Sequence, residues 1–168
     1  MKEVFRNGKC IFTKPNIEDV EDMVEMMNDE NIQSMLSTKK KVITKESEIE
    51  WINQHQDDNT FSVYDFETLE YIGNCGFNEI ENNRGEIGIT IKKEMQGKHY
   101  AKDIINGLIN YGFDVLDLDE IYSIVFSDNK RSINCMIQLG FKEYNRDSNI
   151  FERNGIQVDD VYFNLKRK

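Results

Sequence analysis

The sequence lacks several features that mark whole classes of protein. It contains one proline and three cysteines in 168 residues, and the cysteines are far apart, with no CxxC pair and no histidine cluster. This pattern argues against a disulfide framework and a zinc site, so we expect reduced thiols and no metal. No hydrophobic run approaches the ~20 residues of a membrane-spanning helix. Met1–Arg6 has no apolar run after its charges, so we expect no signal peptide and a cytoplasmic protein.

Basic residues are also scarce. There are 21 Lys and Arg against 31 Asp and Glu, which gives a net charge of −10. Neutralising phosphates requires a basic field, so this charge argues against a general nucleic-acid binder and against anchoring on an anionic membrane. The length is typical of one domain and suffices to bury roughly 70% of the unfolded chain's surface. We therefore expect a single domain that covers residues 1–168.

Hydrophobic periodicity predicts an alternation of helices and strands. Strands are expected at 8–14, 61–64, 69–77, 86–91, 121–126, 141–151 and 157–165, and helices at 17–27, 32–36, 44–55, 98–116 and 129–139. Asn16 and Thr44 are expected to cap helix N-termini, and Gly140 a C-terminus. Ile87, Ile89 and Ile91 are expected on one face of their strand. The run 121–126 is almost continuously apolar, which favours burial on both faces.

The order of these elements predicts the topology. Short turns between the three strands from 61 to 91 indicate an antiparallel meander. The strand, helix and strand from 86 to 126 indicate a right-handed parallel βαβ unit, and Asn154-Gly155 indicates a closing hairpin. We therefore expect an α/β fold: a mixed, mostly antiparallel sheet with a central parallel βαβ unit, flanked by helices.

The segment Gln96-Gly97-Lys98-His99-Tyr100-Ala101 carries the clearest chemical signal. Small residues between a strand and a helix allow a tight turn with outward N–H groups, and the helix N-terminus adds about half a positive charge. This combination favours an anion site, most naturally for a pyrophosphate, although a plain strand-to-helix turn is an equally common meaning. Basic side chains gather here and at the start of the next helix, namely Lys92, Lys93, Lys98, Lys102, Lys130 and Arg131.

The stretch from Gly85 to Phe141 resembles the GCN5-related N-acetyltransferase (GNAT) superfamily. The segment 96–101 is similar to its pyrophosphate loop, Gln/Arg-x-x-Gly-x-Gly/Ala, and 85–91 resembles the strand before it. Asn129-x-x-Ser132-Ile133, ending in Leu139-Gly140-Phe141, resembles the later motif of Asn, a short helix and Leu-Gly-Phe. The likeness is greatest to the RimJ/RimL-type branch, which contains ribosomal-protein N-terminal and spermidine acetyltransferases, and the N-terminal element order extends it over nearly the whole chain.

The resemblance implies acetyl-CoA as cosubstrate and a splay of the parallel strands that opens its site. Backbone amides of residues 97–101 would hold the pyrophosphate, the strand edge at Ile89 to Ile91 would pair with the pantetheine, and Asn129 would bond the cofactor arm or simply cap its helix. The cofactor-binding residues expected are Ile89, Thr90, Ile91, Gln96, Gly97, Lys98, His99, Tyr100, Ala101 and Asn129.

Two positions depart from the family pattern. His99 replaces a glycine, so its ring either clashes with the phosphates or helps to bind them as an imidazolium. Met136 stands four residues before Gly140 where many members have the tyrosine that protonates the leaving thiolate. A thioether cannot donate a proton, so that acid is absent or supplied elsewhere.

Acetyl transfer to an amine needs a base for the amine and donors for the oxyanion. We expect Glu86 as the base, with Glu79 in reserve, although a surface carboxylate is an equally good meaning for Glu86. Ser132 is the candidate proton donor, although a hydroxyl in the first turn of a helix has a simpler role. Tyr100 could also serve, but its helical position favours packing. Amides near Ile89 to Ile91 would stabilise the oxyanion.

Charge gives the only indication of the acceptor. Between Lys14 and Lys39 the chain has no base and a run of seven carboxylates: Glu18, Asp19, Glu21, Asp22, Glu25, Asp29 and Glu30. We expect a cationic acceptor such as a polyamine, an aminoglycoside-like molecule or a protein N-terminus, although a solvated acidic face is the commoner meaning of such a run.

The leading hypothesis is an acetyl-CoA-dependent N-acetyltransferase. The alternative is a non-catalytic acyl-CoA-binding regulatory module on the same fold. A nucleotide-phosphate binder of another type would need a Walker motif or GxGxxG, and neither is present. The exposed edge of the closing hairpin also suggests a homodimer.

Overall fold

A computed structural model describes residues 1–168 and divides the chain into two compact units. The first unit comprises Met1–Asn78 and Gly88–Leu108, and the second comprises Glu79–Ile87 and Ile109–Lys168. The strand order is β1-β2-β3-β4-β5-β6-β8-β7, and β5 and β6 form a parallel pair. The predicted mixed, mostly antiparallel sheet is therefore confirmed. No helix is long and apolar enough to cross a membrane.

Four antiparallel strands form the sheet of the first unit: β1 (Glu3–Asn7), β2 (Cys10–Thr13), β3 (Thr60–Asp65) and β4 (Tyr71–Glu81), whose last residues belong to the second unit. The strand predicted over 8–14 is confirmed at 10–13, but β1 was missed, and Gly8 and Lys9 form the turn between these two strands. The edge strand β1 is mostly exposed and therefore lacks a clear hydrophobic pattern. Its Phe5 stacks on Phe12 with ring centroids 4.1 Å apart.

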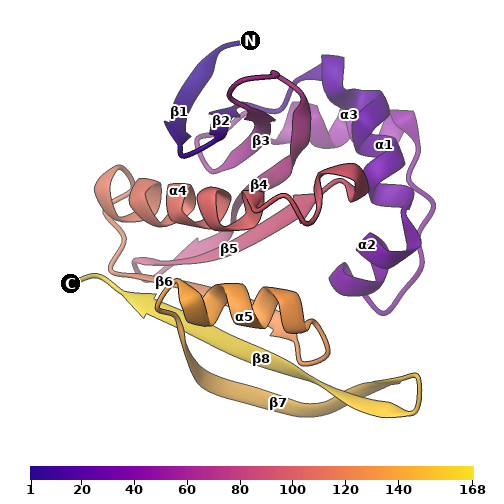
Figure 1. Cartoon of the computed structure of the whole chain (residues 1–168), viewed down its shortest axis with the longest axis vertical. Coiled ribbons are helices and arrows are strands. Elements are labelled where there is room, and N and C mark those ends of the chain that lie inside the picture. Colours follow the sequence, from indigo (N-terminus) through magenta and orange to yellow (C-terminus); the bar gives the residue numbers. More distant parts are fainter. The chain divides into compact units, whose positions relative to one another are not determined.

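Three helices complete the N-terminal half of the first unit. A 3-10 turn (Ile17–Asp19) leads into α1 (Val20–Asn28), followed by α2 (Glu30–Leu36) and α3 (Lys45–Gln54). The side chain of Asn16 accepts from the Glu18 amide, and Thr44 forms a capping box with Ser47, so both predicted N-caps are confirmed. α1 lies beside α2 and α3 (Figure 1). Their apolar faces join two tyrosines in one core cluster: Val20, Met23, Met26, Ile32, Ile52, Tyr64 and Tyr71.

β5 (Arg84–Ile91) and α4 (Tyr100–Asp114) contribute residues to both units, with a 3-10 turn (Lys93–Met95) between them. α4 buries Ile104, Ile105 and Leu108 almost completely, and each such burial stabilises the fold by about 1.5–3 kcal/mol. A Cβ at Gly107 would come within 2.7 Å of the Phe12 ring. Glycine at this position therefore allows α4 to pack closely on β2.

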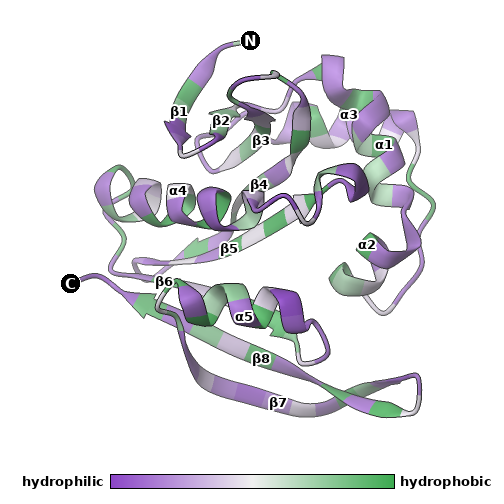
Figure 2. Cartoon of the chain, in the orientation of Figure 1, coloured by the Kyte–Doolittle hydropathy of each residue, from purple (hydrophilic) through white to green (hydrophobic).

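The second unit contains a helix and the closing hairpin. β6 (Glu120–Phe126) is followed by α5 (Lys130–Gln138), β7 (Lys142–Arg153) and β8 (Ile156–Lys166). α5 runs alongside the hairpin (Figure 1), and β7 is mostly hydrophilic along its length (Figure 2). The main buried side chains are Ile121, Met136, Phe141, Val158, Val161 and Phe163. The hairpin predicted around Asn154-Gly155 is confirmed.

Burial in the structure overturns one prediction. The residues of β6 alternate, with Ile121 and Ser123 buried and Tyr122 half-buried, so burial on both faces was wrong. In β5 only Ile87 of the three isoleucines is fully buried. Cys10 and Cys75 are buried free thiols as expected, and burial raises the pKa of Cys10 to about 12, but Cys135 is half-buried.

Candidate active site

The segment between β5 and α4 has an unusual backbone that favours outward amides. Gly97 and His99 have φ of 76° and 67°, both in the left-handed region. Gln96 to His99 are exposed, and the side-chain amide of Gln96 donates to the carbonyl of Ile91 at 2.9 Å. A Cβ at Gly97 would meet nothing within 4 Å, so backbone conformation alone explains the glycine there. This exposed turn before a helix N-terminus is suited to binding an anion.

His99 keeps the backbone shape that a glycine would adopt. An L-residue in the left-handed region is less stable by roughly 1–2 kcal/mol than in the right-handed one, whereas glycine is nearly indifferent. The imidazole is exposed and therefore gains little from packing. Histidine in place of glycine at position 99 thus leaves the conformation of the turn unchanged, and contacts from neighbouring residues must stabilise that conformation.

Tyr100, the first residue of α4, is hydrogen-bonded to Asp65 at the end of β3. Its hydroxyl donates to Oδ2 of Asp65 at 2.6 Å, while Oδ1 of Asp65 accepts from the amides of Glu67 and Thr68, both at 2.8 Å. The hydrogen bond from Tyr100 is the main reason that the pKa of Asp65 is lowered. Burial, followed by this bond, raises the pKa of Tyr100. The phenol is therefore an anchor for the start of α4 and a poor proton donor.

Most of the acidic run in the first unit has partners from other segments. The hydroxyl of Tyr64 donates to buried Asp19, and burial raises the pKa of that carboxyl. Three ion pairs are formed, Glu21 with Lys45 at 2.7 Å, Asp22 with Lys92 at 3.6 Å and Glu30 with Lys40 at 3.8 Å. Asp29 caps α2 through the Ile32 amide. Much of the run is thus structural, and Glu18 and Glu25 have no ion pair.

A pocket of about 190 Å³ opens beside this run. Its lining residues come from α1, from the start of α2 and from the turn after β5: Asp22, Glu25, Met26, Asp29, Lys92, Lys93 and Glu94. Four carboxylates thus face two ammonium groups, one of which, Lys92, is already paired with Asp22. The pocket has an excess of negative charge and one apolar contact, which suits a cationic group on an apolar stem.

The carboxylates predicted for proton transfer belong to the second unit. The parallel ladder between β5 and β6 ends at the pair Glu86–Tyr122, and β5 continues to Ile91 beyond it. Burial raises the pKa of the half-buried Glu86, and the neighbouring Glu79 carboxylate raises it further. Glu79 itself is exposed. A raised pKa brings Glu86 closer to the range of an effective base near neutral pH.

α5 places the remaining predicted residues. Oδ1 of Asn129 accepts from the Ser132 amide at 3.3 Å, so Asn129 is the N-cap of the helix. The Ser132 hydroxyl is half-buried and makes no hydrogen bond. Met136 is only 3% exposed and packs in the core, so neither its chemistry nor its position would allow it to protonate a thiolate.

Residues 9–142 match the family described as acetyltransferase (GNAT) domain. The chain belongs to this family. It is 29% identical to the uncharacterized N-acetyltransferase p20 of Bacillus licheniformis over 155 residues, which are 91% of this chain and 75% of that protein. It is 32% identical to the spermidine N(1)-acetyltransferase of Vibrio cholerae over 98 residues, 56% of this chain and 57% of that protein.

A crystal structure of spermidine N-acetyltransferase from Vibrio cholerae, in complex with CoA and spermine, has a TM-score of 0.84 to this acetyltransferase at 26% identity. The match covers 95% of this chain and 96% of that one. The protein is therefore an N-acetyltransferase enzyme with acetyl-CoA as its cosubstrate. These relationships favour the enzyme over the non-catalytic module. The exposed left-handed turn and its flanking lysines also fit a diphosphate.

The predicted site residues of the acetyltransferase fall into two groups. Ile89 to Ile91 and Gln96 to Ala101 belong to the first unit, whereas Glu79, Glu86, Asn129 and Ser132 belong to the second. Sequence reasoning missed Asp65 and Lys9, which anchor the start of α4. The run Asp65-Phe66-Glu67-Thr68 carries an Asx-turn signature that marks a fixed carboxylate, but nothing in the sequence indicates that it meets Tyr100.

Proposed function

We propose that this acetyltransferase transfers the acetyl group of acetyl-CoA to a primary amine on a cationic acceptor, with a polyamine as the first choice and an aminoglycoside-like molecule or a basic protein N-terminus next. The acidic pocket carries the proposal. We further assign the chain to the RimJ/RimL-type branch, as a single domain over residues 1–168 that could dimerise through the exposed edge of β7.

The charge and position of the pocket support a cationic acceptor. Glu25 has no ion pair, and Lys93 makes none, so the pocket has carboxylates to spare after Asp22 and Lys92 have paired. Lys92, Lys93 and Glu94 directly follow the β5 edge at Ile89 to Ile91, to which we assign the pantetheine. These three residues of the pocket that would bind the acceptor amine are thus adjacent in sequence to the residues of β5 assigned to the pantetheine.

The named relatives point in the same direction. The Vibrio cholerae protein of similar structure binds spermine and CoA in its crystal, and spermine is a polycation. The curated relative from the same organism acts on spermidine. Because identity to this chain is low, the choice of a polyamine rests on the pocket and is supported, not decided, by these names.

We assign the cofactor contacts as the resemblance implies. The amides of residues 97–101 would hold the pyrophosphate, with charge support from exposed Lys98 and Lys102. Acetyl-CoA, when bound, supplies an activated acetyl group and a thiolate leaving group. Asn129 already accepts from Ser132 through Oδ1, which leaves its Nδ2 as the group for the cofactor arm.

Two second-unit residues are assigned to proton transfer. Glu86 takes the proton of the acceptor ammonium, through a water if needed, so that the amine lone pair is free to attack the acetyl carbon. After the attack the nitrogen loses its second proton to solvent as the C–S bond breaks, and the thiolate leaves with the electron pair of that bond. The Ser132 hydroxyl is assigned to donate a hydrogen bond to the departing thiolate. Amides of Ile89 to Ile91 stabilise the oxyanion.

An amine screen tests the proposal. Thiol release from acetyl-CoA is followed with cationic, neutral and anionic primary amines at low and high salt. We expect polyamines to react best and their KM to rise with salt, because screening weakens attraction to carboxylates. Glu25→Gln should raise KM for the cationic amine, while Glu67→Gln, an exposed carboxylate in the β3–β4 turn, should not. Best turnover of neutral or anionic amines, or equal KM in the two variants, would contradict the proposal.

A further inference from the structure

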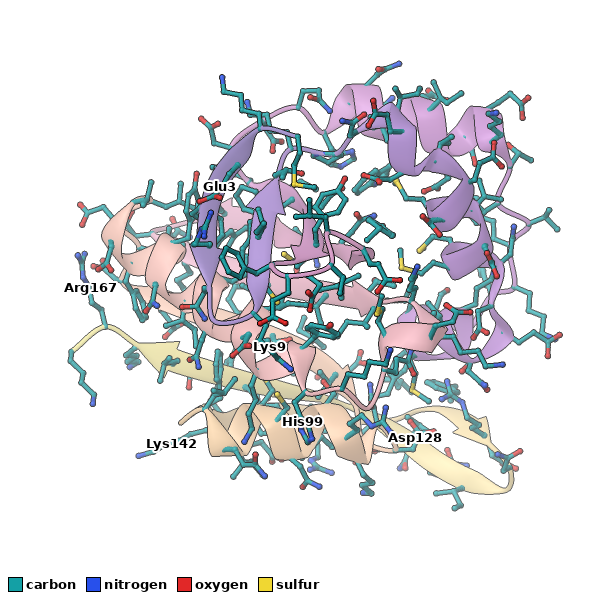
Figure 3. The ribbon with its side chains drawn as sticks, turned by 45° about the horizontal axis from the view of Figure 1, so that its top comes forward. Glu3, Lys9, His99, Asp128, Lys142 and Arg167 are labelled. Atoms are coloured by element: carbon teal, nitrogen blue, oxygen red, sulfur yellow. The ribbon has the colours of Figure 1, made fainter.

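Lys9 lies in the turn between β1 and β2, far in sequence from the segment 96–101, and contacts that segment at the start of α4. Its ammonium donates to the carbonyl oxygen of Lys98 at 2.7 Å and lies 4.6 Å from the centroid of the Tyr100 ring. Figure 3 labels Lys9 and His99, which come from this turn and from the segment before α4. Lys9 thus contacts the residues on both sides of His99.

The backbone of Lys9 is itself fixed at two points. Its amide donates to Oδ2 of Asp103 in α4 at 3.0 Å, and its carbonyl accepts from the Phe66 amide at 2.8 Å. The Asn7 side chain also donates to the Asp103 carbonyl at 2.9 Å. The turn is therefore attached to α4 and to the β3–β4 connection, which places the exposed Lys9 side chain within reach of the Lys98 carbonyl.

The hydrogen bond from Lys9 to the Lys98 carbonyl also determines which way the His99 N–H points. The Lys98 carbonyl and the His99 N–H belong to one planar trans peptide group, in which they point in opposite directions. A carbonyl that accepts from Lys9 therefore directs the His99 N–H away from Lys9. His99 is exposed and has φ of 67°, so this N–H belongs to the turn assigned to the pyrophosphate.

We propose that Lys9 is a positioning residue for acetyl-CoA: it holds the Lys98–His99 peptide so that the His99 amide is presented to the diphosphate. The inference rests on the proposed function of the 97–101 turn. It also explains how a residue with a Cβ keeps a left-handed conformation there, because the ammonium stabilises the one peptide orientation that this conformation requires.

The test uses Lys9→Met, which keeps the aliphatic stem and removes the charge and the donor. Calorimetry measures the Kd of CoA, and kinetics compare acetyl-CoA with acetyl-pantetheine, which has no diphosphate. Because a charge-assisted hydrogen bond is lost, we expect Kd for CoA and KM for acetyl-CoA to rise about tenfold. kcat at saturating acetyl-CoA, and kcat/KM for acetyl-pantetheine, should stay unchanged. Lys9→Arg should restore most of the affinity.

Lys2→Met is the matched control, since it removes the same charge from an exposed residue of the same unit and should leave Kd unchanged. Wild-type affinity in Lys9→Met, or an equal loss with both thioesters, would overturn the inference. Wild-type protein that fails to bind CoA would instead overturn the proposed function of the turn. Should Lys9→Met not fold, the His99 amide in the wild-type NMR spectrum decides: a large shift on adding CoA is expected, and no shift refutes the proposal.

Discussion

The left-handed backbone at His99 makes a prediction about stability that separates the side chain from the backbone. His99→Ala removes the imidazole but keeps a Cβ, whereas His99→Gly removes both. The two variants differ only in the conformational preference of the residue at φ of 67°. Their difference in unfolding free energy therefore measures the strain that a Cβ introduces at this position.

The expected magnitude follows from two opposing effects. The left-handed conformation disfavours alanine by roughly 1–2 kcal/mol. Glycine loses more backbone entropy on folding, which disfavours it by about 0.4–1 kcal/mol. Taking the middle of each range, the Gly variant should be more stable than the Ala variant by about 0.8 kcal/mol. A chain of this size shifts in Tm by roughly 2–4 °C per kcal/mol, so the two variants should differ in Tm by about 2–3 °C.

Urea unfolding of both variants, with m-values compared, gives the difference directly. Asn106 provides the control pair, since it is exposed in the body of α4, where alanine should be favoured over glycine by about 1 kcal/mol. The two sites are thus expected to give opposite signs. An alanine at 99 that is as stable as glycine would refute the reasoning, because it would place residue 99 outside the left-handed region.

Two further predictions concern proton transfer and the anchor of α4. Glu86→Gln should lower kcat/KM by about 10²-fold or more and abolish the acidic limb of the pH–rate profile, because below the raised pKa of Glu86 the carboxyl is protonated and cannot act as a base. Ser132→Ala should lower kcat/KM much less. A pH–rate profile that stays the same in Glu86→Gln would exclude Glu86 as the base. Tyr100→Phe should destabilise by about 1–2 kcal/mol at neutral pH. The pKa of Asp65 is lower in the folded protein than in the unfolded chain, so the Asp65 carboxylate stabilises the fold above its unfolded pKa, and this stabilisation is lost as pH falls through its folded pKa. The difference in unfolding free energy between wild type and Tyr100→Phe, measured in urea, should therefore shrink in acid. A difference that stays constant with pH would contradict the prediction.

Local signals in the sequence were enough to predict most elements of the fold. Thr44 and Ser47, three residues apart, cap α3 by bonding to each other, and Asn82 and Asn83 adopt left-handed φ of 53° and 60°, which asparagine tolerates well. The parallel pair of β5 and β6 follows from the long helix between them, since a short connection cannot join parallel strands. Such features are predictable because the residues that decide them are close in sequence.

Contacts between distant segments were not predictable in the same way. β1 was missed because an edge strand can expose both faces, and only Phe5 reveals that it packs. The acidic run was expected to bind a cationic acceptor or to face solvent, yet Glu21 pairs with Lys45 and Asp22 pairs with Lys92, both from segments further along the chain. Hydrophobic periodicity along the sequence cannot predict such ion pairs, because they depend on the tertiary fold.

The absence of the usual acid at Met136 is less damaging to an acetyltransferase than the absence of a base would be. A thiol has a pKa of about 8.5, so a thiolate is a tolerable leaving group near neutral pH without a proton donor. An alkyl ammonium has a pKa of about 10.4 and is almost wholly protonated there, so its lone pair is unavailable until a base acts. The reaction therefore depends more on a base than on an acid, and a buried methionine in α5 is compatible with catalysis provided that a carboxylate such as Glu86 remains.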